Sequence, residues 1–157
     1  MISEIARTVL SEYETTLQAL RSNVNTIGEY QRAVFFRQIE TEQQYKNGFV
    51  SDRAHDNLAY AADHTNELWS LMNTLEYRSY VEKLRTNVST IFFIRPHKSL
   101  MTNDGIRESV HWDSINKIDG MIKFLLECGN IPYISIYSPL QQERTKTIDY
   151  ILTAKEK

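Results

Sequence analysis

The chain has 157 residues, of which 41% are hydrophobic and 24% charged, and its net charge is −2. This composition predicts one globular domain with a continuous core, and the charge argues against general nucleic-acid binding. The longest apolar run, Ile91–Ile94, is far too short to span a bilayer, and the start at Met1 lacks a secretory signal pattern, so we expect a cytoplasmic protein with no membrane segment. The single cysteine, Cys128, excludes an internal disulfide and is expected to be buried among apolar helix positions.

Helical periodicity dominates the first half of the chain. Apolar residues at three- and four-residue steps predict one helix over residues 2–22 and a second over residues 27–45. A short strand is expected at Phe49–Val50, because both residues favour strands. A helix over residues 56–71 follows, and the pattern continues in a further turn or short helix from Leu75.

A second strand is predicted over Val88–Ile94, where the hydrophobic run is nearly continuous rather than alternating. Such a run is typical of a strand buried on both faces, as in a parallel sheet covered by helices. Pro96 cannot donate to a strand ladder and marks the end of this strand. The polar segment from His97 to Trp112 contains the turn signal Asn103-Asp104-Gly105 and is long enough to suggest a functional loop.

The last third of the chain repeats the pattern of helix, strand and helix. Asp113 is expected to cap a helix that ends at Cys128-Gly129-Asn130, a third strand follows over residues 131–137, and Ser138 caps the closing helix. Every connection between strands contains a helix, which favours parallel strands. The predicted fold class is therefore α/β, with three layers: a parallel sheet that carries helices on both faces.

The stretch Gly48–Arg53 places polar chemistry at the end of a predicted strand. Gly48 releases the preceding helix, and Asp52 and Arg53 stand just before the Asx-rich start of the next one. Ligands of open parallel sheets bind outside the carboxyl ends of the strands, which favours Asp52 and Arg53 as site residues. The alternative is a solvated strand end with a helix-capping acid, and the local pattern does not decide between the two.

Several motifs follow one another in order along the whole chain. They are Glu4-Ile5-Ala6-Arg7, Gln38-x-x-Thr41-Glu42, Gly48-Phe49-Val50-Ser51-Asp52-Arg53-x-x-Asp56-Asn57-Leu58-Ala59-Tyr60, Ile94-Arg95-Pro96, Asn103-Asp104-Gly105-Ile106-Arg107, and Gly129-x-Ile131-Pro132-Tyr133-x-x-Ile136 with Glu143-Arg144. Their order and spacing resemble the body of a P-loop kinase-like ATPase family. That family includes the ribosylnicotinamide kinase domain and small phage-encoded nucleotide kinase-like proteins.

The resemblance implies a role for particular residues of this chain. Asp52 would face the phosphates, where it would hold Mg²⁺ through water or accept the proton of the acceptor hydroxyl. Arg53 and Arg107 would bind phosphate oxygens, since a guanidinium fits such a pair of oxygens in a bidentate way. Residues 96–112 would form a lid that carries Arg107 and hinges at Asp104-Gly105.

Further cofactor contacts are expected from Arg95, Asp104 and Arg144, with Arg144 near the nucleotide base. Arg95 with His97 and Lys98 could hold an anion, and the alternative is a solvated basic loop. The implied cofactors are ATP and Mg²⁺, and the implied partners are a nucleotide and a small-molecule phosphoryl acceptor. The four histidines show no i, i+4 pair and no nearby cysteine, which argues against a zinc site and favours surface or loop positions.

The sequence departs from the family at its beginning. Members begin with a strand and a loop G-x-x-x-x-G-K-[ST], whose amides and lysine hold the β- and γ-phosphates. None of the five glycines here has that spacing, and Met1 stands about where the family has completed the loop, its helix and a second strand. We therefore expect an N-terminally incomplete P-loop kinase-like fold, with kinase-like phosphoryl transfer in the complete protein and weak ATP binding by this chain alone.

The same departure bears on the sheet. In the family the missing strand lies centrally, so its absence would leave unpaired strand edges, which are costly to bury. We expect residues 49–52 and 89–94 either to pair directly or to leave a gap, which a second copy or a partner chain would cover. The alternative function is a non-enzymatic interaction protein on a degenerate P-loop kinase scaffold. Phosphoryl transfer to DNA would need a basic groove, which the composition does not show.

Overall fold

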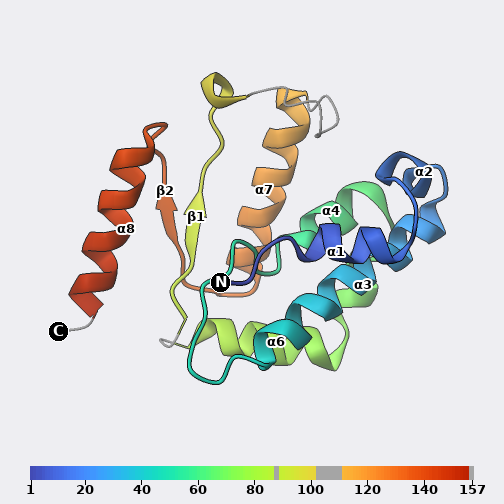
Figure 1. Ribbon diagram of the computed structural model, residues 1–157, viewed down its shortest axis with the longest axis horizontal. Coiled ribbons are helices and arrows are strands. Elements are labelled where there is room, and N and C mark those ends of the chain that lie inside the picture. The colour runs from blue at the N-terminus through green and yellow to red at the C-terminus, as the bar shows by residue number, and fades with distance from the viewer. Residues whose placement is uncertain (87–88, 102–110, 156–157) are drawn as a thin grey trace. The chain divides into compact units, whose positions relative to one another are not determined.

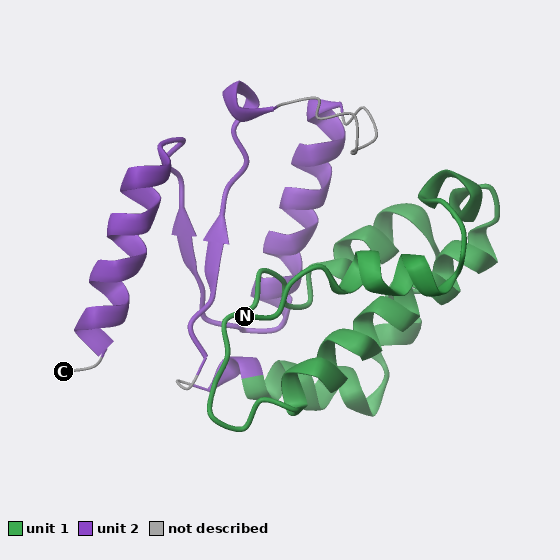
Figure 2. Cartoon of the chain, viewed as in Figure 1, with its two compact units in different colours: residues 1–83 green, residues 84–157 purple. Residues whose placement is uncertain are grey.

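The structure of the protein is a computed structural model, and it describes residues 1–86, 89–101 and 111–155. The chain divides into two compact units, residues 1–83 and residues 84–157 (Figure 2). Each unit is described by itself below. The prediction of a single 157-residue domain stays a prediction.

The first unit is helical, and a long central helix organises it. The helices are α1 (Ile5–Glu12), α2 (Leu17–Arg21), α3 (Val24–Gln43), α4 (Asn57–His64), α5 (Leu68–Met72) and α6 (Leu75–Arg85), and the last two residues of α6 belong to the second unit. Helices α1, α2 and α4 pack against α3, and α5 packs against α4. A buried cluster joins α1, α2 and α3, and its members are Val9, Leu20, Ile27, Tyr30 and Val34. The second predicted helix is thus confirmed as α3, with slightly different ends.

Two predicted helices are each broken in two. The helix expected over residues 2–22 stops at Glu12, because Glu14 takes a left-handed φ of 50° and the Thr16 hydroxyl accepts the Ala19 N–H at 3.2 Å. The helix expected over residues 56–71 ends at His64, because Thr65 takes an extended backbone with a φ of −142° and its hydroxyl accepts the Glu67 N–H at 2.9 Å. In both places a threonine hydroxyl replaces a backbone partner, which competes with helix continuation.

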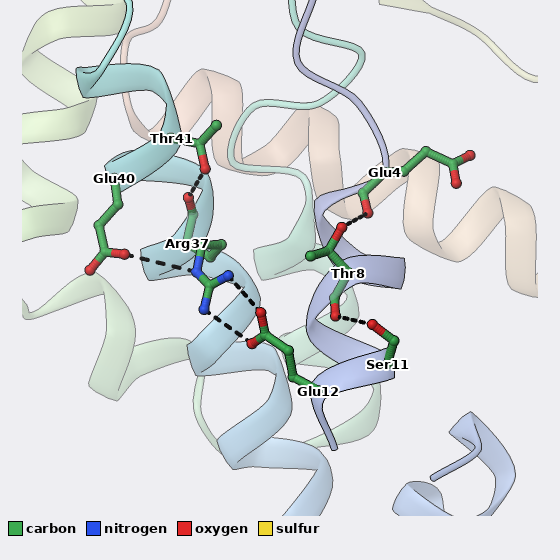
Figure 3. A network of polar contacts seen from close by, with 7 residues as sticks. All are labelled: Glu4, Thr8, Ser11, Glu12, Arg37, Glu40 and Thr41. Carbon is green, nitrogen blue, oxygen red and sulfur yellow. Dashed lines mark hydrogen bonds and ion pairs between the residues drawn. The ribbon is translucent and has the colours of Figure 1, made fainter. Parts of the chain in front are cut away.

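Surface ion pairs tie α1 to α3 (Figure 3). The Arg37 guanidinium donates to both carboxylate oxygens of Glu12, at 2.8 and 3.0 Å, and lies 3.9 Å from Glu40. The Thr41 hydroxyl donates to the Arg37 carbonyl at 2.7 Å one turn further along α3. This bidentate contact fixes the register of the two helices on the exposed side.

The second unit holds a two-stranded parallel sheet. Its elements are β1 (Phe92–Ile94), the 3₁₀ helix η1 (Lys98–Leu100), α7 (Trp112–Cys128), β2 (Ile134–Ile136) and α8 (Gln141–Lys155). Phe92 pairs with Ile134 and Ile94 pairs with Ile136 in parallel register. Figure 1 draws the two strands between α7 and α8. The predicted strands at 88–94 and 131–137 are confirmed in shortened form, residues 87–88 lying outside the described part.

The strand expected at Phe49–Val50 is not formed as a regular strand. Ile2 makes a single parallel bridge with Ser51, in which the Ile2 N–H donates to Val50 O at 2.7 Å and the Asp52 N–H donates to Ile2 O at 3.2 Å. One partner residue is too short to build a ladder, although Ile2 itself is buried. The described part of the chain is therefore mostly helical, α/β with little sheet. Direct pairing of residues 49–52 with 89–94 stays a prediction.

Two sequence predictions about single features can also be compared. Cys128 is exposed at the last residue of α7, so the expectation of a buried thiol was wrong. Leu125 and Leu126 of the same last turn are buried, whereas Cys128 at the end of the helix is not. Among the described residues, no helix combines the length and apolarity needed to cross a membrane.

Candidate functional site

The candidate site is the turn from Ser51 to Asn57, between α3 and α4. Gly48 has a φ of 92°, a left-handed conformation that suits glycine, and it redirects the chain after α3 as the sequence predicts. The backbone of Val50 and Asp52 is then held by buried Ile2. The turn is therefore anchored at its start by main-chain hydrogen bonds rather than left as a loose loop.

Asp52 and Arg53 project from this anchored segment toward solvent. The Asp52 residue is exposed, and its carboxylate has no hydrogen-bond or ion-pair partner within the described residues. Arg53 Nη1 donates to Asp56 Oδ2 at 2.6 Å, and the Asp56 Oδ1 atom accepts the Ala54 N–H at 3.1 Å. Asp56 raises the pKa of Arg53 above its ordinary value, with a further contribution from Tyr60, so Arg53 is a cation at every physiological pH.

Asp56 thus orients the arginine, and Tyr60 is a further hydrogen-bond neighbour, while part of the guanidinium stays exposed. The Arg53 side chain keeps 53% of its surface exposed, against 15% for Asp56. A guanidinium has five N–H donors, and Asp56 engages its Nη1 end. The rest of the fork can bind a phosphate or carboxylate in the bidentate way that such groups favour.

His55 sits in the middle of this turn and is almost completely buried. Its exposed fraction is 2%, and neither ring nitrogen has a hydrogen-bond partner within the described residues. The Oδ1 atom of Asn57, two residues later, is also buried without a partner there. Burial lowers the pKa of His55, against a smaller opposite effect of Asp56. His55 therefore lies in a loop, one of the two positions expected for the histidines, but its side chain is buried.

Arg95 lies at the end of β1, in the second unit. Its guanidinium binds both carboxylate oxygens of Asp119 on α7, with Nε to Oδ1 at 2.9 Å, and the hydrogen bonds to Asp119 raise its pKa. The same guanidinium lies 4.9 Å from the ring centre of Phe93 and 5.6 Å from that of Tyr137. An anion could bind the Arg95 guanidinium only by displacing Asp119. Arg95 therefore has a more clearly structural role than Arg53.

The remaining predicted site residues fall into two groups. Asp104 and Arg107 lie outside the described residues, as does most of the expected lid over residues 96–112. Of its described part, His97 contacts the Tyr137 carbonyl through Nε2 and precedes η1. Arg144 on α8 donates through Nε to the Ser138 carbonyl at 2.6 Å, which is a local helix-end contact.

The implied cofactors can be compared with the side chains present. Within the described residues no group of three or more His, Cys, Asp or Glu side chains is arranged to hold a metal ion. Nucleotide-bound Mg²⁺ needs only one or two carboxylates, because phosphates and water complete its shell, so the single exposed carboxylate of Asp52 fits such an ion. The glycine-rich motif whose backbone amides hold a triphosphate does not occur in this sequence, so the chain lacks that part of a nucleotide site.

The sequence analysis assigned no role to several residues that hold these sites together. Gln38 and Glu42 are buried on α3, and Asp119 is buried on α7, with exposed fractions of 3%, 3% and 7%. Each is a polar residue within an apolar stripe of its helix, and this pattern could have identified them from the sequence. A polar residue in such a stripe is expected to bind a specific partner, because an unpaired buried polar group is costly.

The anchored turn therefore carries an exposed carboxylate on Asp52 and, on the next residue, an oriented and half-exposed guanidinium. Such an arrangement can bind an oxyanion and can accept a proton next to it. A comparison of the chain with protein-family models, with curated proteins and with solved structures returned no match.

Proposed function

We propose that the Ser51–Asn57 turn is the phosphoryl-acceptor side of a nucleotide- or nucleoside-kinase-like protein. The observation that carries this proposal is that Arg53, oriented by Asp56, directly follows Asp52, whose exposed carboxylate has no partner within the described residues. The resemblance of the surrounding motifs to P-loop kinase-like ATPases supports it, as do the parallel strands β1 and β2. The complete protein would then have the three-layer parallel sheet of that family and would work in the cytoplasm.

In this proposal the two side chains divide the work. Arg53 binds the phosphate or another oxyanion of the acceptor, and Asp52 accepts the proton of the attacking hydroxyl or contributes one ligand to Mg²⁺. A magnesium nucleotide, when bound, supplies the phosphoryl group and neutralises its charge. This chain lacks the glycine-rich phosphate loop, so by itself it should bind acceptor without efficient transfer.

Binding of the acceptor tests the proposal directly. Isothermal titration of the chain with a panel of nucleosides, nucleoside monophosphates and nicotinamide riboside should reveal at least one ligand. Arg53→Gln should weaken that ligand about tenfold or more, because a charge-assisted hydrogen bond contributes about 1.5–3 kcal/mol. Arg7→Gln is the matched control, since Arg7 is an exposed arginine in an equivalent i, i+3 pair with Glu4. Equal weakening by the two variants, or no binding of any ligand, would contradict the proposal.

Transfer from ATP is the second measurement. The chain with ATP, Mg²⁺ and the same panel should give product at background level, and ATP with Mg²⁺ should not raise its melting temperature. Robust transfer that disappears in Asp52→Asn would overturn the expectation that this chain cannot work alone. It would at the same time support Asp52 as a catalytic residue.

A second candidate function is a non-enzymatic interaction protein, and one observation favours it. In the parallel register of β1 and β2, the N–H and C=O groups of Phe92 and Ile94 point away from β2, and they have no backbone partner among the described residues. A two-stranded parallel sheet is rarely stable by itself, so another strand is expected to cover this edge. Ile94→Pro removes an outward N–H without touching the β1–β2 bonds. It should abolish any concentration-dependent association seen by light scattering, and its failure to do so would argue against this candidate.

A further inference from the structure

A buried polar pair on α3 lies directly beneath the candidate site. Gln38 and Glu42 are each 3% exposed and stand one helical turn apart. The Gln38 Nε2 atom lies 2.8 Å from Glu42 Oε1, 3.0 Å from Ser51 Oγ and 3.4 Å from the Arg53 carbonyl. One side-chain amide thus connects a buried carboxylate to the backbone and side chain of the turn.

The other side of Glu42 faces donors from α6. The Tyr80 hydroxyl donates to Glu42 Oε1 at 2.8 Å, and Lys83 Nζ lies 3.7 Å from Glu42 Oε2. Burial, and then Glu42 itself, raise the pKa of Tyr80 above its ordinary value, so the phenol keeps its proton and acts as the donor. Gln38, Tyr80 and Lys83 therefore all present hydrogen atoms to the Glu42 carboxylate, which accepts from them.

We propose that Glu42 is a positioning residue for Asp52 and Arg53 and that it acts through Gln38; the inference rests on the function proposed above. A carboxylate accepts hydrogen bonds only, so Gln38 must turn its NH₂ group, not its carbonyl oxygen, toward Glu42. That NH₂ group has a second hydrogen, which is thereby directed at Ser51 Oγ and the Arg53 carbonyl. The opposite amide orientation would set oxygen against oxygen at Glu42 and at the Arg53 carbonyl, whereas the Ser51 hydroxyl could donate to it.

The orientation passes on to the functional residues through the main chain. Ser51 Oγ also accepts the Arg53 N–H at 3.3 Å, so both the N–H and the C=O of Arg53 depend on the Gln38–Ser51 arrangement. The backbone of Arg53 fixes where its guanidinium starts, and Asp56 fixes where it ends. Asp52 stands between Ser51 and Arg53 in the chain, so its backbone is flanked by two held residues. The alternative is that Gln38 and Glu42 merely fill buried space.

A polarity swap separates positioning from packing. The double variant Gln38→Glu/Glu42→Gln keeps the volume, the charge and one hydrogen bond between the two side chains, but it turns a carboxylate toward the Arg53 carbonyl. Amide exchange measured by NMR should then become about five- to tenfold faster at Arg53 and Ala54, relative to amides inside α3 such as Val34. The Kd of the strongest acceptor found in the panel should rise about tenfold.

Tyr80→Phe is the matched control, because it removes a hydrogen bond from the same carboxylate and leaves the orientation of Gln38 set by Glu42. It should lower the free energy of unfolding while changing exchange at Arg53 and the acceptor Kd by less than about twofold. If the swapped variant does not fold, Glu42→Gln alone serves. Its amide can present either end to Gln38, and exchange at Arg53 should still rise by more than twofold.

The outcomes separate this inference from the proposed function. A swap that leaves exchange at Arg53 unchanged, or a Tyr80→Phe effect as large as that of the swap, would overturn the positioning role. If wild-type chain binds no acceptor, the proposed function fails. Exchange at Arg53 and Ala54 then still decides whether Glu42 orders the turn.

Discussion

The burial of His55 predicts that the first unit loses stability on mild acidification. The imidazole is 2% exposed, and neither nitrogen has a partner among the described residues. Burying a charged ring there would be costly, so the folded state favours the neutral form. His55→Leu replaces the ring by an apolar side chain of similar volume that has no nitrogen atoms to satisfy. Such a replacement should be neutral or stabilising near pH 7, because it removes unpaired buried polar atoms.

The sign of the pH dependence follows from the lowered pKa of His55. Below the unfolded-state pKa of about 6.5, the unfolded chain binds a proton at this residue and the folded chain does not. The free energy of unfolding therefore falls as the pH drops from about 6.5 toward the lower folded-state pKa. One proton gives a slope of at most about 1.4 kcal/mol per pH unit in that window.

Urea unfolding followed by far-ultraviolet circular dichroism between pH 5 and pH 8 measures this slope. The difference between wild type and His55→Leu should grow as the pH falls below about 6.5 and stay constant above about 7.5, since other titrating groups cancel. His111→Gln is the control, because it removes an exposed histidine at the start of α7. A difference that does not depend on pH, or one that grows in the alkaline direction, would refute the buried neutral state of His55.

Three further predictions concern other contacts. Asp119→Ala should lower the free energy of unfolding by about 2–3 kcal/mol, because it leaves the half-buried Arg95 without its bidentate partner. Lys123→Ala, at the exposed pair with Glu127, should lower it by less than about 0.5 kcal/mol. Urea unfolding midpoints compare the two variants, and equal losses of stability would contradict the structural role of Asp119. Arg37→Ala should cost about 0.5–1 kcal/mol at low salt and less in 1 M NaCl, and a cost that salt does not reduce would exclude a screened surface pair (Figure 3). Cys128 should react with a water-soluble maleimide in the native state at nearly the rate seen in urea, and strong native-state protection would show that the thiol is covered.

The helices that the sequence predicted well are those with a strong apolar stripe. Helices α3 and α7 match the predicted segments to within a few residues. Apolar residues at helical spacing form one face that must be buried, and this holds whichever elements the helix packs against. The breaks at Glu14 and Thr65 could not be read from periodicity. They depend on single hydroxyl and backbone contacts that override a continuous pattern.

The strand at Phe49–Val50 failed for a different reason. Two β-prone residues favour an extended backbone, but a strand also needs a partner along its length, and Ile2 provides only one position. The strands β1 and β2 were predictable because their apolar, β-prone residues pair with each other. Phe93 and Ile136 are buried, but Ile94 is 46% exposed, so the expectation that this strand is buried on both faces was wrong. Local propensity therefore located the extended segments, and tertiary pairing decided which became a sheet.

The candidate site was predictable in its residues but not in its support. Asp52 and Arg53 stand out in the sequence as charged residues between a glycine-ended helix and an Asx-rich helix start. The roles of Asp56, Gln38 and Glu42 depend on distances across the fold, which spacing alone does not give. Gln38 and Glu42 were still detectable as polar residues on a buried helix face, a pattern that warrants a search for partners.

Backbone NMR titration tests the central claim most directly, because it locates a ligand on the chain without requiring catalysis. Nitrogen-15 labelled protein titrated with nucleosides and nucleoside monophosphates should show saturable shift changes that are largest between Ser51 and Asn57. The same changes should be strongly reduced in Arg53→Gln and retained in Arg7→Gln. Shift changes that centre on β1 and β2, or none with any acceptor at millimolar concentration, would contradict the assignment of this turn as an acceptor site.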